Sequence, residues 1–140
     1  MSVIDIHPHI VSPDTKRYPL APLGGMQSTW SSERPTTYET LLKEMDAAGV
    51  NKAAIVHSST AYGYDNSYVA DAVAAVPSRF AGVYSIDVLA PDAVRTFDYW
   101  LGRGCGHGSR STNIFSRRWS PRVQLQSESC TARQAASCFS

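Results

Sequence analysis

The sequence has few of the features that mark membrane, secreted or nucleic-acid-binding proteins. No apolar run approaches the roughly 20 residues that span a bilayer, and Asp5 interrupts the N-terminus before a signal-peptide core could form. The three cysteines are odd in number and lack metal-type spacing. With 13 Lys plus Arg against 12 Asp plus Glu, the charge is too balanced for a surface that binds nucleic acid or anionic lipid. We therefore expect a cytoplasmic protein that binds neither nucleic acid nor membrane.

The composition changes abruptly near residue 106. Residues 1–106 hold 8 Lys or Arg and 11 Asp or Glu, whereas residues 107–140 hold 5 Arg and one acid, Glu128. The second segment carries 8 serines, contains no Lys or Asp, and shows neither a strand nor a helix period. We interpret residues 1–106 as the folded part and residues 107–140 as an irregular Ser/Arg-rich tail of frameshifted or otherwise aberrant origin.

The first segment alternates between the periodicities of strands and helices. Near-continuous apolar runs predict strands of the kind buried on both faces of a parallel sheet, at residues 3–7, 52–57 and 80–86. Amphipathic stretches predict the helices between and after them, at residues 37–48, 66–76 and 91–101. Thr36 and Glu39 have the spacing of a capping box that starts the first helix, and Gly49 can end it. This order predicts an α/β fold with right-handed parallel crossovers.

Polar side chains follow each predicted strand. The triplet His7-Pro8-His9 comes after the first strand, His57 ends the second and Asp87 follows the third. Ligands of parallel α/β folds collect at the carboxyl ends of the strands. The long connection at residues 8–34 also rises over this edge, and loops of that length are usually functional or disordered.

The histidine pair is the sharpest motif. In an extended chain, side chains at i and i+2 point to the same side, so Asp5, His7 and His9 would line one face and the two imidazoles could converge on one metal ion. Pro8 would hold His7 in the extended region. The alternatives are a chance pair and a turn just beyond the strand. The position at the end of the first strand adds weight to the metal, and both alternatives stay open.

Five further residues are candidates for binding a substrate, and each has a structural alternative. His57 either faces the substrate or is a satisfied polar group at a strand end. Asp65 and Asn66 either contact the substrate or cap the following helix. Tyr64 either lines an aromatic pocket or covers the sheet, and Asp87 either touches the substrate or orients another group.

Several segments together resemble a known family. The run Val-Ile-Asp-Ile-His-Pro-His at residues 3–9, the helix ending Met-Asp-Ala-Ala-Gly-Val at residues 45–50 and the strand ending at His57 resemble the N-terminal part of amidohydrolase-related TIM-barrel hydrolases. Residues 62–68 and 77–83 are similar to the branch that includes 2-pyrone-4,6-dicarboxylate lactonase. The resemblance ends where the composition changes.

The resemblance implies a partial (β/α)8 TIM barrel of about three βα units. It implies a divalent metal, commonly zinc, with His7 and His9 as ligands from the first strand. The implied reaction is hydrolysis of a lactone, ester or amide bond in a small carboxylated or cyclic substrate, although some relatives decarboxylate aromatic acids and others hydrolyse lactones without metal. The family's other ligands come from later strands, and a closed barrel needs about 250 residues. We therefore expect an incomplete copy of such an enzyme.

A noncatalytic chain is the alternative. Three parallel strands leave an open sheet edge, and such an edge favours pairing with another strand. The chain would then be an inert fragment or a small interaction domain that self-associates through this edge.

Overall fold

The chain is described by a computed structural model that covers residues 2–26, 29–33 and 35–103. The predicted tail at residues 107–140 lies outside the described residues. Within them the elements follow in the order β1 (Ile4–Asp5), α1 (Trp30–Glu33), α2 (Tyr38–Ala48), β2 (Lys52–Val56), α3 (Ser59–Tyr62), α4 (Ser67–Ala75), β3 (Phe80–Val83) and α5 (Ala93–Leu101).

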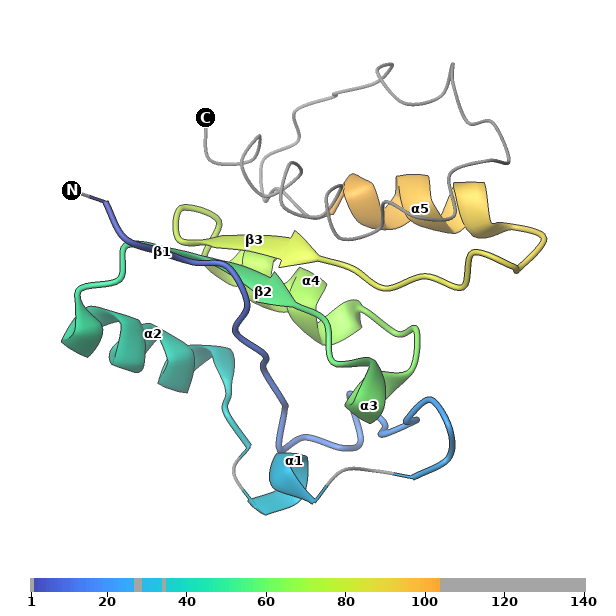
Figure 1. The fold of residues 1–140 in the computed structure, drawn as a ribbon, viewed down its shortest axis with the longest axis horizontal. Coiled ribbons are helices and arrows are strands. Elements are labelled where there is room, and N and C mark those ends of the chain that lie inside the picture. The colour runs from blue at the N-terminus through green and yellow to red at the C-terminus, as the bar shows by residue number, and fades with distance from the viewer. Residues whose placement is uncertain (1, 27–28, 34, 104–140) are drawn as a thin grey trace.

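The strands form one parallel sheet in the order β1-β2-β3 (Figure 1). Asp5 pairs with Ala53, and Ala53 pairs in turn with Phe80. Each connection between neighbouring strands contains a helix, as parallel pairing requires. The predicted α/β class with parallel strands is confirmed, and the partial TIM barrel that the resemblance implies stays a prediction.

Helix α2 starts one residue later than the capping-box prediction. Thr37 is the N-cap, with its hydroxyl accepting the Thr40 N–H at 3.3 Å. The prediction of Thr36 was wrong by one position, because the next threonine takes the cap and Thr40 rather than Glu39 is the third residue after it. Gly49 ends the helix at φ 70°, as predicted, and its N–H bonds the Asp46 carbonyl.

The main core lies where α2 and α4 pack against the sheet, below it in the view of Figure 1. Ala53 and Phe80 share one face of the sheet because paired residues point the same way. They pack with buried side chains of the two helices, Leu41, Met45, Val69, Ala72 and Val73. A separate, smaller cluster is formed by the alternate positions Ala54, Val56 and Val83.

Strand β1 differs from the prediction of a strand buried on both faces. It spans Ile4–Asp5, and the side chains of Val3, Ile4 and Ile6 are 49%, 44% and 70% exposed. The reason is its place at the edge of the sheet, with β2 on one side. Strands β2 and β3 are largely buried, although β3 ends at Val83, before the predicted end at residue 86.

Helix α5 carries the predicted apolar stripe without burying it. None of its side chains is fully buried, and Val94 is 66% exposed. Its contact with the sheet end is aromatic, with the rings of Tyr84 and Trp100 centred 5.5 Å apart. Helices α1 and α3 were not predicted, because four residues are too few to show a helical period. In the described part of the chain, no helix has the length and apolarity needed to cross a bilayer.

Candidate functional site

The two N-terminal histidines lie side by side just after β1. Their ring centres are 5.0 Å apart and the ring planes are nearly perpendicular, at 87°. His7 is exposed and His9 is half-buried. The structure therefore brings together the two imidazoles that the sequence predicts as metal ligands, at the carboxyl end of an edge strand.

The end of β2 fixes the ring of His9. The Nδ1 atom lies 2.9 Å from the carbonyl oxygen of Val56, and the Val56 N–H bonds the carbonyl of Pro8 at 2.9 Å. A carbonyl only accepts, so Nδ1 carries the proton and the lone pair of the neutral ring is on Nε2. Histidines that bind metals usually donate their other ring N–H to a carbonyl or carboxylate in this way.

Asp5 does not extend the pair as the strand alternation predicts. Its Oδ1 accepts the backbone N–H of His7 at 3.1 Å, across a bend at Ile6. Among residues 2–26, 29–33 and 35–103, no three His, Cys, Asp or Glu side chains are placed to hold one metal ion. The described site therefore offers two nitrogen ligands.

The separation of the two rings fits a shared ion. Imidazoles that bind one tetrahedral zinc ion at about 2.1 Å have ring centres roughly 5 Å apart. The distance of 5.0 Å between the ring centres of His7 and His9 is compatible with such an arrangement. The ring spacing and the oriented tautomer of His9 both suit a zinc-class metal, which prefers nitrogen ligands of this kind.

His57 lies directly after β2 and is 3% exposed. Its Nε2 lies 2.9 Å from the Gly63 carbonyl, so Nε2 holds the proton, and Nδ1 is buried without a hydrogen-bond partner in the structure. Burial lowers the pKa of His57, the nearby His9 lowers it further, and the Gly63 carbonyl and Asp65 act in the opposite direction. A neutral imidazole thus lies beside the histidine pair, with its lone pair on Nδ1.

The carbonyl that holds His57 belongs to a crowded turn. Gly63 has φ 62°, and a Cβ there would meet the Ala21 carbonyl oxygen at 2.7 Å. The long first connection is fastened at this point, because the Ala21 N–H bonds the Ala61 carbonyl at 2.8 Å and the Ser12 N–H bonds the Tyr62 hydroxyl at 2.8 Å. These bonds hold the described residues of this connection against α3.

Asn66 occupies a structural position. Its side chain is fully buried and its amide donates to the carbonyls of Tyr64 and Ser85 at 3.1 and 2.9 Å, while its Oδ1 accepts the Ser85 N–H at 2.9 Å. These bonds join the start of α4 to the segment after β3. Asn66 therefore has its hydrogen-bonding capacity engaged by the backbone, and its binding of substrate stays a prediction.

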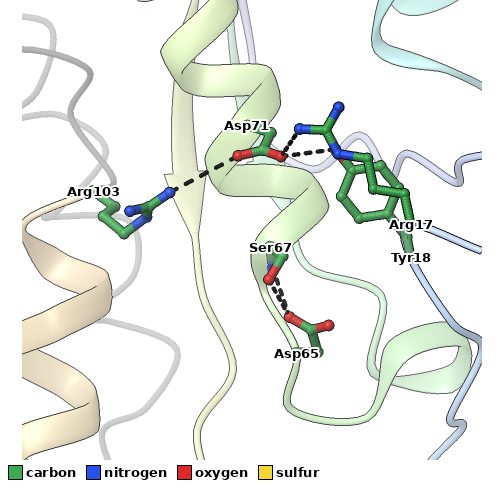
Figure 2. Close-up of polar contacts among 6 residues, drawn as sticks. All are labelled: Arg17, Tyr18, Asp65, Ser67, Asp71 and Arg103. Atoms are coloured by element: carbon green, nitrogen blue, oxygen red, sulfur yellow. Dashed lines mark hydrogen bonds and ion pairs between the residues drawn. The ribbon is translucent and has the colours of Figure 1, made fainter.

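The other predicted substrate residues make local contacts. Oδ1 of Asp65 accepts both the N–H and the hydroxyl of Ser67 at the start of α4 (Figure 2). Oδ1 of Asp87 accepts the N–H of Leu89 at 2.9 Å. Tyr64 is 43% exposed. Asp65 thus contacts the start of α4, as expected if its role is structural. None of these contacts tests whether Asp65, Asp87 or Tyr64 also binds substrate.

A polar network centred on Asp71 was not predicted. Tyr18 donates its hydroxyl proton to Oδ2 at 2.7 Å, and the Arg17 guanidinium reaches the same oxygen at 2.8 Å (Figure 2). Arg103 approaches the other oxygen at 3.8 Å from beyond the end of α5. Burial and the Asp71 carboxylate raise the pKa of Tyr18. Tyr18 and Arg17 tie the long first connection to α4, and Arg103 adds a longer ion pair from the segment after α5.

One hollow of the described residues lies away from the histidines. It has a volume of about 320 Å³ at the amino end of the sheet, where Arg79 bonds Asp46 and the carbonyls of Val50 and Asn51. In barrels of parallel strands this end serves stability, whereas the carboxyl end carries the chemistry. The hollow therefore does not compete with the histidine pair as a candidate site.

Comparison with known proteins identifies a shared fold. The described fold is similar to a probable 2-pyrone-4,6-dicarboxylic acid hydrolase from Acinetobacter baumannii, whose crystal structure contains citric acid. The TM-score is 0.59 at 16% sequence identity. The chain shares its fold with part of this hydrolase. The match covers 74% of this chain and 35% of the hydrolase, so the chain spans about a third of that protein's length. No family model and no curated protein matches the sequence.

Proposed function

We propose that this chain is the N-terminal, metal-binding part of an amidohydrolase-like hydrolase. The reaction is hydrolysis of a lactone, ester or amide bond in a small carboxylated or cyclic substrate. The observation that carries the proposal is the pairing of the His7 and His9 rings, 5.0 Å apart, where the first parallel strand ends. The likeness of the fold to the Acinetobacter hydrolase supports it.

The residues of this chain have distinct parts in the proposed site. His7 and His9 would hold a divalent ion, zinc in the first instance. Such an ion, when bound, lowers the pKa of its water and polarises a carbonyl oxygen. The Val56 carbonyl keeps the His9 ring in the tautomer whose Nε2 binds metal. Buried His57 stays neutral, so its Nδ1, which has no hydrogen-bond partner among the described residues, presents a lone pair rather than positive charge.

Completion of the reaction needs more than the described residues. Eight strands close a barrel, whereas three are present here and match about a third of the neighbour. The substrate contacts that we propose from this part stay His57, Tyr64, Asp65, Asn66 and Asp87. Tyr64 is exposed, and Asp87 follows β3. We further propose a cytoplasmic setting for the protein, in line with its three cysteines.

Metal binding tests the proposal. The purified 140-residue chain is dialysed against zinc, and the bound metal is measured for the wild type and for His7→Ala and His9→Ala. We expect binding by the wild type and at least a tenfold weaker affinity for each variant, because one ligand of the pair is lost. Equal metal content in all three proteins would remove the ligand assignment.

Ring opening of 2-pyrone-4,6-dicarboxylate, measured by ultraviolet absorbance, tests the reaction. Release of carbon dioxide instead would indicate a decarboxylase.

A noncatalytic interaction domain is the second candidate. It is favoured by the exposed side chains of Val3, Ile4 and Ile6, which lie in the edge strand β1 or directly beside it. Such a domain would associate in the absence of metal. A chelator that leaves the association unchanged would favour it over the hydrolase.

A further inference from the structure

Strand β1 leads to the histidine pair, but burial does not fix its position in the sheet. It pairs with β2 over two residues, Ile4 opposite Lys52 and Asp5 opposite Ala53. The side chains of residues 3–6 are all exposed. A one-residue slip in register turns every side chain of a strand to the other face, and only the burial of one face strongly opposes it. A contact other than apolar packing must therefore fix the register of β1.

Asn51, the residue before β2, holds the start of β1 with two hydrogen bonds. Its Oδ1 accepts the Val3 N–H at 2.9 Å, and its own N–H donates to the Val3 carbonyl at 2.8 Å. Successive residues of a strand direct their N–H and carbonyl groups to opposite sides. A slip by one residue would turn both groups of Val3 away from β2, so both bonds would be lost. The side chain of Asn51 thus favours the observed register.

The backbone of Asn51 is held in turn by Arg79. The Nε–H of Arg79 donates to the Asn51 carbonyl. Its Nη2 donates to the Val50 carbonyl at 3.0 Å and to the Asp46 carboxylate at 2.9 Å. Arg79 lies directly before β3 and Asp46 lies in α2. The residue that holds β1 is therefore fixed to the body of the domain.

The chain beyond the histidines is held by different groups. His9 is bonded to the Val56 carbonyl, and Ile10 directly after it is 1% exposed. His7 is exposed and lies between these contacts and the start of β1. The 5.0 Å separation of the two rings therefore depends on where β1 places His7, and so on the register at Val3.

We propose that Asn51 is a positioning residue for the histidine pair, because its hold on Val3 sets the register of β1 and so brings the ring of His7 beside that of His9. The inference rests on the proposed function for the metal that the two rings would bind. It gives the amino end of the sheet a part in the site, since a side chain there determines how the ligands at the carboxyl end are placed.

The contact between the two rings in the metal-free chain tests the inference directly. In the full 140-residue chain, ring centres 5.0 Å apart should give nuclear Overhauser effects between the ring protons of His7 and His9. Asn51→Ala removes the acceptor of the Val3 N–H, so we expect these effects to be lost. Asn51→Asp keeps an oxygen that can accept the same N–H, and should restore them.

Thr37→Ala is the matched structural control. It also removes one side-chain oxygen that accepts a backbone N–H, that of Thr40, and should lower the free energy of unfolding in urea. We expect its ring contact to stay as in the wild type. If Thr37→Ala lost the contact as well, or if Asn51→Ala kept it, Asn51 would contribute only to general stability and the inference would be wrong.

Hydrogen exchange of the Val3 amide gives a second measurement, on the wild type itself. The bond to Oδ1 of Asn51 should protect this amide in the folded chain. An amide that exchanges as fast as in an unfolded chain would contradict the hold by Asn51, even if Asn51→Ala failed to fold.

Zinc affinity separates this inference from the proposed function. If both are correct, the wild type binds zinc from zinc sulfate, and Asn51→Ala binds it roughly tenfold more weakly, because a group that orients a ligand is lost. Equal zinc affinity of the two proteins would overturn the inference and keep the metal assignment. Loss of the ring contact in Asn51→Ala, together with no zinc binding by the wild type, would overturn the metal assignment and keep Asn51 as the residue that positions the rings.

Discussion

The hydroxyl of Tyr18 donates to the carboxylate of Asp71 at 2.7 Å, joining residues that are 53 positions apart. Tyr18 lies in the long connection after β1 and Asp71 lies in α4 (Figure 2). This contact fixes the connection against the body of the domain. The connection in turn bonds α3 through Ala21 and Leu23.

Removal of the Tyr18 hydroxyl should therefore destabilise the fold. Tyr18→Phe keeps the buried ring and loses a hydrogen bond to a charged acceptor, so the free energy of unfolding should fall by about 2 kcal/mol in urea denaturation. Arg17→Ala is the matched control, because Arg17 contacts the same oxygen but its side chain is 66% exposed. An exposed ion pair contributes less than about 1 kcal/mol. If the two variants lost the same free energy of unfolding, the Tyr18 hydroxyl would not be the main contact that holds this connection to α4.

Asn66 offers a test of structure against substrate binding. Asn66→Ala leaves the N–H of Ser85 and the carbonyls of Tyr64 and Ser85 without their partner, so we expect a loss of about 2–4 kcal/mol of stability. Asn66→Asp can still accept from Ser85 but cannot donate, and should also destabilise. Hydrogen exchange at the Ser85 amide should accelerate in Asn66→Ala. If Asn66→Ala kept its stability but lost substrate binding, Asn66 would be a substrate contact, as the sequence suggested.

Two glycines of positive φ should respond differently to the same substitution. Gly63→Ala combines a φ of 62° with a Cβ that would meet the Ala21 oxygen at 2.7 Å. Gly24→Ala has a φ of 86° but no atom within 4 Å of the added Cβ. The second change should cost about 1 kcal/mol, and the first substantially more because backbone must move. Urea denaturation of both variants measures the difference, and similar losses would show that crowding at Gly63 is relieved cheaply.

The sequence predicted the features that local patterns determine. Apolar runs located the three strands, and His7 and His9 were correctly expected to lie together after the first of them. The prediction that Asp5 shares their face failed, because the chain bends at Ile6 and the carboxylate turns to the His7 N–H. Periodicity describes a regular strand, and this one ends after two residues.

Contacts between distant segments could not be read from the sequence. Nothing near Tyr18 or Arg17 in the chain indicates Asp71 as their partner, and nothing near Asn66 indicates Ser85. The edge position of β1, and so the exposure of Ile6, also depends on which strands lie beside it. Such features depend on which distant segments come together, and local sequence patterns do not contain this information.

The buried His57 ring should make stability depend on pH. Its pKa is lowered in the folded state, chiefly by burial, so the unfolded chain takes up a proton at higher pH than the folded chain does. The contribution of His57 to stability is therefore complete above about pH 6.5, the unfolded value, and decreases as the pH falls below it, by at most about 1.4 kcal/mol per pH unit. His57→Gln should flatten this part of the profile, because glutamine can donate to the Gly63 carbonyl without titrating. Urea denaturation between pH 5 and pH 8 measures both profiles. If stability fell with pH in the same way for the wild type and His57→Gln, the acid sensitivity would come from other groups. His57 would then not be the neutral buried base that the contacts of its two ring nitrogens indicate.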